Sequence, residues 1–395
     1  MRNIQGSIHK RRLLCILITL VMAVYLLGCS PEEQSSVPTE RLTTQSTNDG
    51  KCIEIYDTHL YDLLQLNDDE ELSVLDVKEN ILLCTVDREY TEDDPYHRYE
   101  GNNASTLRLF LYDISDHVVK EEITFDKGEF CIDAVIMDDS IIYALVTMDS
   151  ATKNEVFSCW IATDDETLLV HESNCTTMGE MGPYLVVLGG TTAAFSFYDP
   201  HTGNFGFSLI SAEGREIPIL NCYDNDETTM LWTELVSNGD VCVYFYGKNS
   251  ESTFVICDKN GNATECAIDN RVYRIYNYAI LENSLVFSAQ DISVETEKIK
   301  QIIIEVDFGG NIIKSLDHKA LYRLQSDGNN YAMGIDMSYQ VYLVASNMNQ
   351  LDITEIDIES VFPEGRAVLF ASGKSGQFFL NYRYERALFL VLLSD

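Results

Sequence analysis

The chain has 395 residues, and its 63 acidic side chains outnumber 27 basic ones to give a net charge of −36. A charge of this size opposes binding to nucleic acid or anionic membrane surfaces and favours basic proteins, cations or neutral ligands such as glycans as partners. A solvated acidic surface that keeps the protein soluble explains the same charge without any partner. Hydrophobic residues make up 46% of the chain, enough for the core of one large repeat domain.

The amino terminus has the pattern of an export signal. Lys10-Arg11-Arg12 precede the apolar run Leu13–Leu27, which at about 15 residues is short for a membrane span. The run ends in Leu26-Leu27-Gly28-Cys29, which resembles the lipobox of bacterial lipoproteins. That resemblance implies that residues 1–28 are a signal peptide and that a diacylated Cys29 anchors the protein to the bacterial membrane outside the cytoplasm. An uncleaved signal anchor is the alternative.

The segment after Cys29 is predicted to be a flexible tether. Residues 29–50 are rich in Ser, Thr, Glu, Gln and Pro and have too few apolar side chains to bury a core. The folded domain is therefore expected to occupy residues 51–395. Removing the signal peptide takes away four basic residues and no acids, which changes the net charge from −36 to −40.

Nine of the eleven cysteines lie in the expected domain. Their odd number and irregular spacing argue against a disulfide framework, and no Cys/His cluster has the spacing of a zinc site. Most lie inside apolar runs, as buried free thiols do. Cys257 and Cys266 flank one hairpin, so a cross-strand bridge between them is the pairing to test.

Residues 273–317 contain a repeat unit that the rest of the domain follows. The apolar runs Ile275–Leu281, Leu285–Ala289, Ile302–Val306 and Ile312–Leu316 are predicted to be four strands joined by polar or Gly-containing turns. Four antiparallel strands in about 45 residues is the repeat length of a β-propeller blade.

The turn between the first and second strands recurs along the domain. Each copy is a polar or Gly-containing segment between apolar runs, and Asn-Gly in particular favours a tight hairpin. The copies are Lys78–Asn80, Asp138–Ser140, Gly182-Pro183, Asn238-Gly239, Glu282-Asn283, Ser326–Gly328 and Gly373–Gly376. Seven turns predict seven units.

The turn between the third and fourth strands has a common chemistry. Asp accepts backbone amides at the start of the turn, and Gly supplies the left-handed residue that closes it. The copies are Tyr112–Asp116, Tyr198–Asn204, Cys257–Asn262 and Val306–Asn311, with looser ones at Thr163–Glu166 and Ser346–Asn349. Asp-x-x-Thr-Gly-Asn after an aromatic strand resembles quinoprotein-like and related bacterial propeller repeats. The Gly-His and Trp-Asp pairs of Trp-Asp repeat propellers are missing, and the resemblance does not extend to a quinone cofactor.

The predicted third strands are apolar on both faces, whereas a half-exposed sheet alternates. Strands covered by a neighbouring sheet on each side have this composition, which favours a propeller over a sandwich. These strands are Leu107–Tyr112, Val156–Ile161, Ala194–Tyr198, Phe254–Cys257, Ile302–Val306 and Val341–Val344.

The last unit supplies only three strands, Ala367–Ala371, Gln377–Tyr382 and Ala387–Leu393, while Cys52–Tyr56 is a spare strand after the tether. Adding the spare strand to the last unit would close the ring and remove two sheet edges. We therefore predict an all-β, seven-bladed β-propeller of four-stranded antiparallel blades, closed by an amino-terminal strand, with six or eight blades as the alternative. Leu60–Leu66 is the one candidate for a short helical turn.

A candidate ligand site is predicted where irregular loops gather. Loops between second and third strands and connections between blades lie at one end of a propeller's channel, and two such loops belong to adjacent blades if the ring closes as expected. Aromatic rings, carboxylates and a His there suit a sugar or a cation. The candidate residues are Tyr90, Asp93, Asp94, Tyr96, His97, Tyr99, Tyr382, Arg383, Tyr384 and Arg386. An ordinary solvated loop is the alternative.

No nucleophile elbow, phosphate loop or metal-ligand motif occurs in the sequence. No cofactor is expected, although calcium at the acidic clusters 68–71, 164–166 or 224–227 is an alternative to a plain solvated loop. We therefore expect a non-catalytic binding or scaffold module at the cell envelope, for a protein or glycan ligand. A glycan-active hydrolase or lyase with its site at the channel mouth is the alternative, because such a site needs no local motif.

Overall fold

The repeat unit at residues 273–317 forms one antiparallel sheet. Its strands are β20 (Tyr273–Ile280), β21 (Ser284–Asp291), β22 (Lys300–Asp307) and β23 (Ile312–Asp317), hydrogen-bonded in that order. β22 is buried along most of its length, whereas β23 has only exposed and half-buried residues. The apolar sequence on both faces of the third strand therefore marks a strand that is covered on both sides, as predicted.

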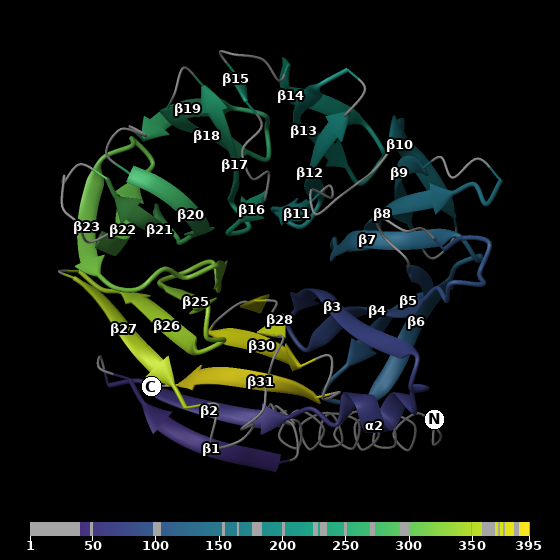
Figure 1. Ribbon diagram of the computed structural model, residues 1–395, viewed down its shortest axis with the longest axis horizontal. Coiled ribbons are helices and arrows are strands. Elements are labelled where there is room, and N and C mark those ends of the chain that lie inside the picture. The colour runs from purple at the N-terminus through teal and green to yellow at the C-terminus, as the bar shows by residue number, and fades with distance from the viewer. Residues whose placement is uncertain are drawn as a thin grey trace, which may run out of the picture. The chain divides into compact units, whose positions relative to one another are not determined.

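Seven sheets of this kind surround a central axis, so the fold is a seven-bladed β-propeller (Figure 1). The computed structural model describes residues 40–47, 50–97, 104–151, 155–163, 166–175, 184–199, 202–223, 228–229, 235–248, 251–268, 273–292, 300–348, 350–357, 368–369, 372–373, 376–382 and 387–394. The chain divides into two units, residues 1–37 and Pro38–Asp395, and every described residue belongs to the second.

The blades follow one another in chain order. Blade 1 is β3 (Glu70–Lys78), β4 (Ile81–Glu89), β5 (Ala104–Asp113) and β6 (Val118–Thr124); blade 2 is β7 (Glu129–Ile136), β8 (Ile141–Met148), β9 (Glu155–Ala162) and β10 (Thr167–Cys175). Blade 3 is β11 (Leu185–Leu188), β12 (Thr192–Asp199), β13 (Asn204–Ser211) and β14 (Glu216–Tyr223). Blade 4 is β15 (Thr228–Thr229) with β16 (Val236–Ser237), then β17 (Val241–Lys248), β18 (Glu251–Asp258) and β19 (Ala263–Ile268). Blade 5 is the unit above, and blade 6 is β24 (Arg323–Ser326), β25 (Tyr331–Ile335), β26 (Val341–Ser346) and β27 (Leu351–Ile356).

Blade 7 joins the two ends of the domain, which confirms the predicted closure. It contains β28 (Val368–Leu369) and β29 (Ser372–Gly373), then β30 (Gln377–Tyr382), β31 (Ala387–Ser394) and β2 (Cys52–Asp57). β2 pairs antiparallel with β31 from Cys52 opposite Ser394 to Asp57 opposite Phe389. Figure 1 shows the amino-terminal strands lying along the carboxy-terminal ones at the edge of the ring.

The tether prediction needs a correction at its carboxy-terminal end. Residues 40–46 of the expected tether form strand β1 (Glu40–Ser46), which pairs with β2 as a fifth strand outside blade 7. Gln45 on β1 also donates a hydrogen bond of 2.6 Å to the Glu355 carbonyl oxygen in blade 6. An outermost strand needs backbone hydrogen bonds but no buried face, so its polar sequence gave no sign of it.

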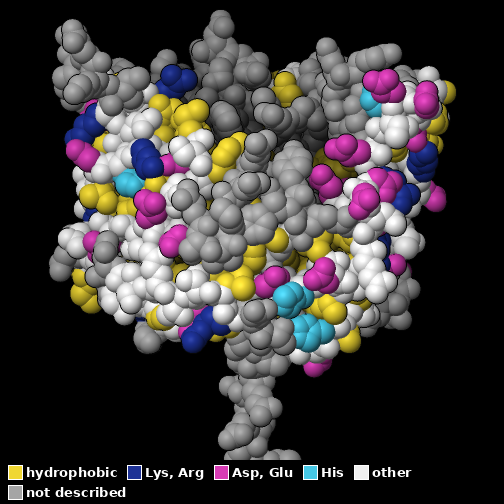
Figure 2. Space-filling model, turned by 60° about the horizontal axis from the view of Figure 1, so that its bottom comes forward, with side chains coloured by type: hydrophobic (Ala, Val, Ile, Leu, Met, Phe, Trp, Pro, Cys, Tyr) yellow, Lys and Arg dark blue, Asp and Glu magenta, His cyan; other side chains and the backbone are white. Residues whose placement is uncertain are grey.

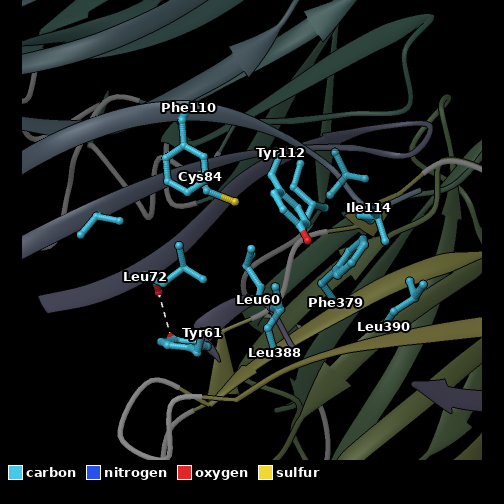
Figure 3. Packing of buried hydrophobic residues seen from close by; sticks show 13 residues of the cluster. Leu60, Tyr61, Leu72, Cys84, Phe110, Tyr112, Ile114, Phe379, Leu388 and Leu390 are labelled. Carbon is cyan, nitrogen blue, oxygen red and sulfur yellow. Dashed lines mark hydrogen bonds between the residues drawn. The ribbon is translucent and has the colours of Figure 1, made fainter. Parts of the chain in front are cut away.

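The core at the ring closure combines residues from both ends of the domain (Figure 3). Leu60 and Tyr61 of the short helix α2 (Leu60–Leu64) pack among side chains of blade 1 and of β30 and β31. The Tyr61 hydroxyl lies 3.3 Å from the Leu72 carbonyl oxygen and 3.0 Å from Oδ1 of Asn381, and the Asn381 amide donates to the same carbonyl at 2.7 Å. The expected helical turn is therefore present and contributes to the closure.

Side chains on three innermost strands link neighbouring blades. Asp76, Asp133 and Asn277 each follow an irregularity in the strand register, and each accepts a hydrogen bond of 2.6–3.0 Å from an amide of the next blade's innermost strand. Two of them are carboxylates, which are stronger acceptors than a neutral amide oxygen. These links hold blades 1–2, 2–3 and 5–6 together beside the channel.

Blade 3 departs from the predicted strand assignment. Thr192–Asp199 is its second strand, not its third, and the turn before it is Gly189-Gly190; the predicted turn Gly182-Pro183 lies outside the described residues. The segment Tyr198–Asn204 therefore joins the second and third strands, whereas Cys257–Asn262 and Val306–Asn311 join third and fourth strands as predicted. An Asp- and Gly-containing turn satisfies only its own backbone, so it closes either kind of hairpin.

The proposed bridge between Cys257 and Cys266 is wrong. Cys257 pairs with Ala263 and Cys266 with Phe254, so the two cysteines are offset by three positions along the strands, and both are free. Three positions correspond to about 10 Å, which is beyond the reach of a disulfide. The residue directly opposite Cys257 on its other side is Cys242 on β17.

Candidate functional site

The connectivity of the blades defines two faces of the ring. Turns between first and second strands and between third and fourth strands lie on one face, and we call the other the rim face. The rim face carries the loops between second and third strands and the connections between blades. Both predicted segments, after β4 and after β30, are second-to-third loops of the adjacent blades 1 and 7, so they share this face.

Two aromatic rings of the predicted blade 1 loop, those of Tyr90 and Tyr96, pack within the protein. Tyr90 is only 8% exposed and stacks on Tyr96, with ring centroids 5.7 Å apart. Tyr96 in turn covers Gly128 in the connection to blade 2, where a Cβ atom would come within 2.5 Å of the ring. Burial raises the pKa of Tyr90. These two rings hold the loop against the next blade.

The acidic residues of this loop differ in their surroundings. Asp94 forms an ion pair with Lys127, and its carboxylate also accepts the Tyr96 amide at 3.0 Å. Asp93 is exposed and His97 is half-buried. Asp94 therefore closes the loop, and the surface of the loop presents Asp93 and His97. The predicted ligand role of the loop stays a prediction.

The second predicted segment is described only at its first residue. Tyr382 is 2% exposed and meets Phe389 edge to face, with ring centroids 5.6 Å apart, so its ring belongs to the core of blade 7. The other predicted residues of the two loops, Tyr99, Arg383, Tyr384 and Arg386, lie outside the described residues. The structure therefore does not bring the predicted set together as one described surface.

The acidic cluster at residues 68–71 is occupied by ion pairs. Arg88 lies 3.0 Å from Asp69 and 2.6 Å from Glu70. Across the described ranges no group of three or more His, Cys, Asp or Glu side chains is arranged to hold a metal ion. Residues 164–165 and 224–227 of the other two clusters are outside those ranges. Figure 2 shows Asp and Glu side chains spread over one face of the molecule among hydrophobic and uncharged residues.

A different part of the rim face exposes large apolar and aromatic side chains. We define the blade 6 patch as Tyr276, Tyr322, Met337 and Tyr339. Tyr322, Met337 and Tyr339 are 36%, 76% and 50% exposed, and the half-buried ring of Tyr276 lies 6.0 Å from that of Tyr322. The Tyr322 amide bonds to the Ile335 carbonyl oxygen at 2.8 Å, which fixes the connection from blade 5 against the β25–β26 loop.

Tyr339 occupies a position that two matching turns fill with glycine. Turns starting at Asp258, Asp307 and Asp336 share one pattern: the carboxylate accepts amides two and four residues later at 2.7–3.1 Å. The residue three positions after each Asp bonds back to its carbonyl oxygen at 3.0 Å. That residue has φ of 84° in Gly261, 85° in Gly310 and 63° in Tyr339. A side chain in this left-handed region costs about 1 kcal/mol relative to glycine.

The base of the blade 6 patch is a network of charged and aromatic side chains. Lys319 lies 2.5 Å from the Asp336 carboxylate and 4.9 Å from the ring centroid of Tyr342, and the His318 ring meets the same Tyr edge to face. Burial alone would raise the pKa of Asp336, but hydrogen bonds from Lys319 and two backbone amides together lower it. Burial lowers the pKa of His318, which keeps it neutral at pH 7. The network holds the loop that presents Tyr339 in one conformation.

Sequence reasoning missed the blade 6 patch for an identifiable reason. The segment Asp336–Gln340 aligns with the turns at Asp258 and Asp307 only if Tyr339 is matched to their glycines, and the missing Gly hid the turn. The signal that would have found it is an Asp turn between two apolar strands with an aromatic residue at its left-handed position.

Comparisons with known proteins agree with the fold. No protein family model matches the chain, and no curated protein matches its sequence. A chain of the mitotic checkpoint complex is similar at 12% identity and a TM-score of 0.50, covering 93% of this chain and 98% of that one. Prolyl oligopeptidase B from Galerina marginata gives 7% identity and a TM-score of 0.51, over 87% of this chain and 55% of that one. The β-propeller domain of the trilobed protease from Pyrococcus furiosus gives 15% and 0.45, over 65% and 78%. At these identities the likenesses show the β-propeller fold alone.

No described helix is long and apolar enough to cross a membrane.

Proposed function

We propose that this chain is a lipid-anchored, extracytoplasmic β-propeller that acts as a non-catalytic binding module, with a protein ligand on the blade 6 patch. Tyr339 is the observation that carries the proposal. It is half exposed at a backbone position where two turns with the same hydrogen-bond pattern, between the third and fourth strands of blades 4 and 5, have glycine. An unfavourable backbone conformation on an exposed loop is explained if the side chain itself is needed there, and ligand contact is such a need.

The composition of the blade 6 patch favours a protein over a glycan. Tyrosine and methionine are enriched in protein–protein interfaces, where a rigid ring and a flexible thioether fit apolar side chains of a partner. Met337 is the most exposed member, and a thioether offers a sugar hydroxyl only a weak hydrogen-bond acceptor. The neighbouring charges of Lys319 and Asp336 are already paired with each other.

The charges around the patch also favour binding over catalysis. A general acid at neutral pH needs a carboxyl with a raised pKa, and the pKa of Asp336 is lowered instead. Burial raises the pKa of Asp327, but this carboxyl lies on the opposite face, in the turn between β24 and β25, and accepts amides of Asn329 and Tyr331. Asp327 therefore stabilises the backbone of the β24–β25 turn.

Replacing Tyr339 by Gly and Tyr322 by Ala tests the binding role. We expect each change to lower capture of the ligand by the full-length anchored chain about tenfold, because exposed aromatic anchors carry most of the energy of such interfaces. Tyr339→Gly is expected to leave the thermal midpoint unchanged or higher, since Gly is the residue that this turn prefers. Capture is measured by crosslinking pull-down from envelope extract, with quantification of the retained proteins.

Tyr223→Ala is the matched control, because Tyr223 is 60% exposed on the same face at the end of blade 3. Equal losses in the control and in the two patch variants would overturn the assignment to the blade 6 patch. Turnover of envelope glycans by the purified chain, unaffected by the patch variants, would favour the hydrolase or lyase alternative.

A separate change tests the anchor. Cys29→Ala is expected to leave unprocessed, unacylated precursor, because the thioether to the diacylglyceryl group needs the cysteine sulfur. Two acyl chains give stable attachment where one does not. The variant is held only by its uncleaved leader, so proteolytic removal of the leader followed by a high-salt wash should release it from the membrane fraction. The acylated wild type should stay bound. Normal acylation and attachment of the variant would refute the lipoprotein assignment.

A further inference from the structure

Two cysteines of blade 4 lie directly opposite each other on its central strands. Cys242 on β17 pairs with Cys257 on β18 in an unbroken antiparallel register from Val241 to Lys248. Directly opposed residues in such a ladder have Cα atoms about 4.5–5.5 Å apart, inside the range of about 4.4–6.8 Å in which disulfides occur. The backbone therefore already has the spacing that a cross-strand bridge needs.

The two cysteine side chains point into the same part of the core, between blades 3 and 4. Opposed residues in an antiparallel pair lie on the same face of the sheet, and both cysteines belong to one apolar cluster between blades 3 and 4. Their thiols hydrogen-bond to each other, and this bond, ahead of burial, raises the pKa of Cys242 and lowers that of Cys257. Both residues are 0% exposed. The two thiols are therefore already neighbours within the core.

Other cysteines in blade 4 and its neighbours are excluded as partners. Cys266 is offset by three positions from Cys257, and its thiol donates a hydrogen bond of 3.0 Å to the Phe308 carbonyl oxygen in blade 5. Cys222 lies on β14, the outer strand of blade 3, and is paired with Phe205 rather than with a strand of blade 4. The geometry thus singles out one pair.

We propose that Cys242 and Cys257 are a site of disulfide formation, closed by a thiol–disulfide exchange partner while blade 4 folds. The proposal rests on the extracytoplasmic location proposed above for its occurrence in the cell, although its chemistry does not. The Cys257 thiolate attacks one sulfur of the partner's disulfide and releases a thiolate, which takes up a proton. Cys242 then loses its proton and attacks the Cys257 sulfur, which expels the remaining partner thiolate. Two cysteine thiols are oxidised, and one partner disulfide is reduced to two thiols.

The burial of the pair determines when the reaction occurs. Neither sulfur is accessible once blades 3 and 4 have packed, so exchange precedes that packing, and the finished bond is protected from reducing agents. In the β17–β18 hairpin the two cysteines enclose a loop of 14 residues between them, short enough to close early in folding. Because the bond forms before packing and is buried afterwards, it is a permanent structural disulfide rather than a reversible one.

Refolding in a glutathione redox buffer tests the chemistry on the full chain. We expect differential alkylation under denaturing conditions to show two fewer free thiols than in chain refolded with excess reductant. Peptide mass spectrometry should recover Cys242 linked to Cys257 with a mass about 2 Da below the sum of the two reduced peptides. The oxidised form should unfold about 4 °C higher than the reduced form.

Cys266→Ala is the matched control and should leave the linkage and the midpoint difference intact, whereas Cys257→Ala should abolish both. Alkylation of both Cys242 and Cys257 after oxidative refolding, or linkage of Cys257 to a different cysteine, would overturn the proposal. The second part of the experiment applies the same alkylation and peptide mass spectrometry to protein isolated from cell envelopes. A bond that forms on refolding but is missing in envelope chain contradicts the proposed location and leaves the geometry standing, so the two failures are distinguishable.

Discussion

Replacing Ile55 by Asp is expected to prevent closure of the propeller. Ile55 lies on β2, is 1% exposed, and packs in one cluster with side chains of β25, β26 and β30. A carboxylate there has no cation within the cluster, and leaving a charge buried without a partner costs roughly 4 kcal/mol. Domains of this kind are stable by only about 5–15 kcal/mol. The expected result is a chain that unfolds at a much lower denaturant concentration or accumulates as aggregate.

The matched control for this change is Leu42→Asp on the neighbouring strand β1. Leu42 is 36% exposed, so the same new carboxylate stays in water and the cost should remain within about 0.5 kcal/mol. Urea unfolding followed by circular dichroism measures both variants. Equal midpoints for Ile55→Asp and Leu42→Asp would mean that β2 does not hold the ring closed.

The closure was predictable because it follows from counting strands. The last unit shows three apolar runs, and Cys52–Tyr56 alternates apolar and polar residues in the way that a half-covered strand requires. β1 gives no such pattern, because its place outside β2 demands only backbone hydrogen bonds. A strand whose side chains bury nothing leaves no periodic mark in the sequence.

The shape of the ring was more predictable than the places of its loops. Strand runs recur because each blade buries the same faces, whereas the sequences of the second-to-third loops share no such constraint. Tyr90 and Tyr96 illustrate the difference: their type suggested a ligand site, but their packing on each other and on Gly128 depends on the connection to blade 2. Composition identified aromatic loops, and only the fold distinguishes rings that pack inward from rings that face solvent.

The blade 6 patch and the blade 4 cysteines show what register adds to composition. Tyr339 is distinctive because the turns at Asp258 and Asp307, which share its hydrogen-bond pattern, have glycine at the same position. The sequence suggested Cys266 as the cross-strand neighbour of Cys257, which is wrong, because the register places Cys242 opposite Cys257 and Ala263 on its other side. In both cases the residue type alone did not indicate a role. The role follows from the residue directly opposite on the next strand, or from the residue at the matching position of a similar turn.

Replacing Gly206 by Ala is expected to be the most damaging change of a single methyl group. Gly206 lies within β13, and a Cβ atom on it would overlap the carbonyl oxygen of Leu220 and lie 2.7 Å from that carbonyl carbon. The obstacle is backbone of β14, so it cannot move aside as a flexible side chain does. Separating the two strands would strain the pairing from Asn204 to Ile210, at a cost of about 3 kcal/mol.

Gly239→Ala separates this steric effect from backbone conformation. Gly239 has φ of 92° and nothing within 4 Å of its would-be Cβ, so the methyl group meets only the conformational cost of about 1 kcal/mol. Thermal unfolding of both variants should therefore show a clearly larger decrease in the midpoint temperature for Gly206→Ala than for Gly239→Ala. Equal decreases in the midpoint temperature would mean that β13 and β14 can move apart at little cost in stability. Blade 3 would then be held by its neighbours rather than by its own strand pairing.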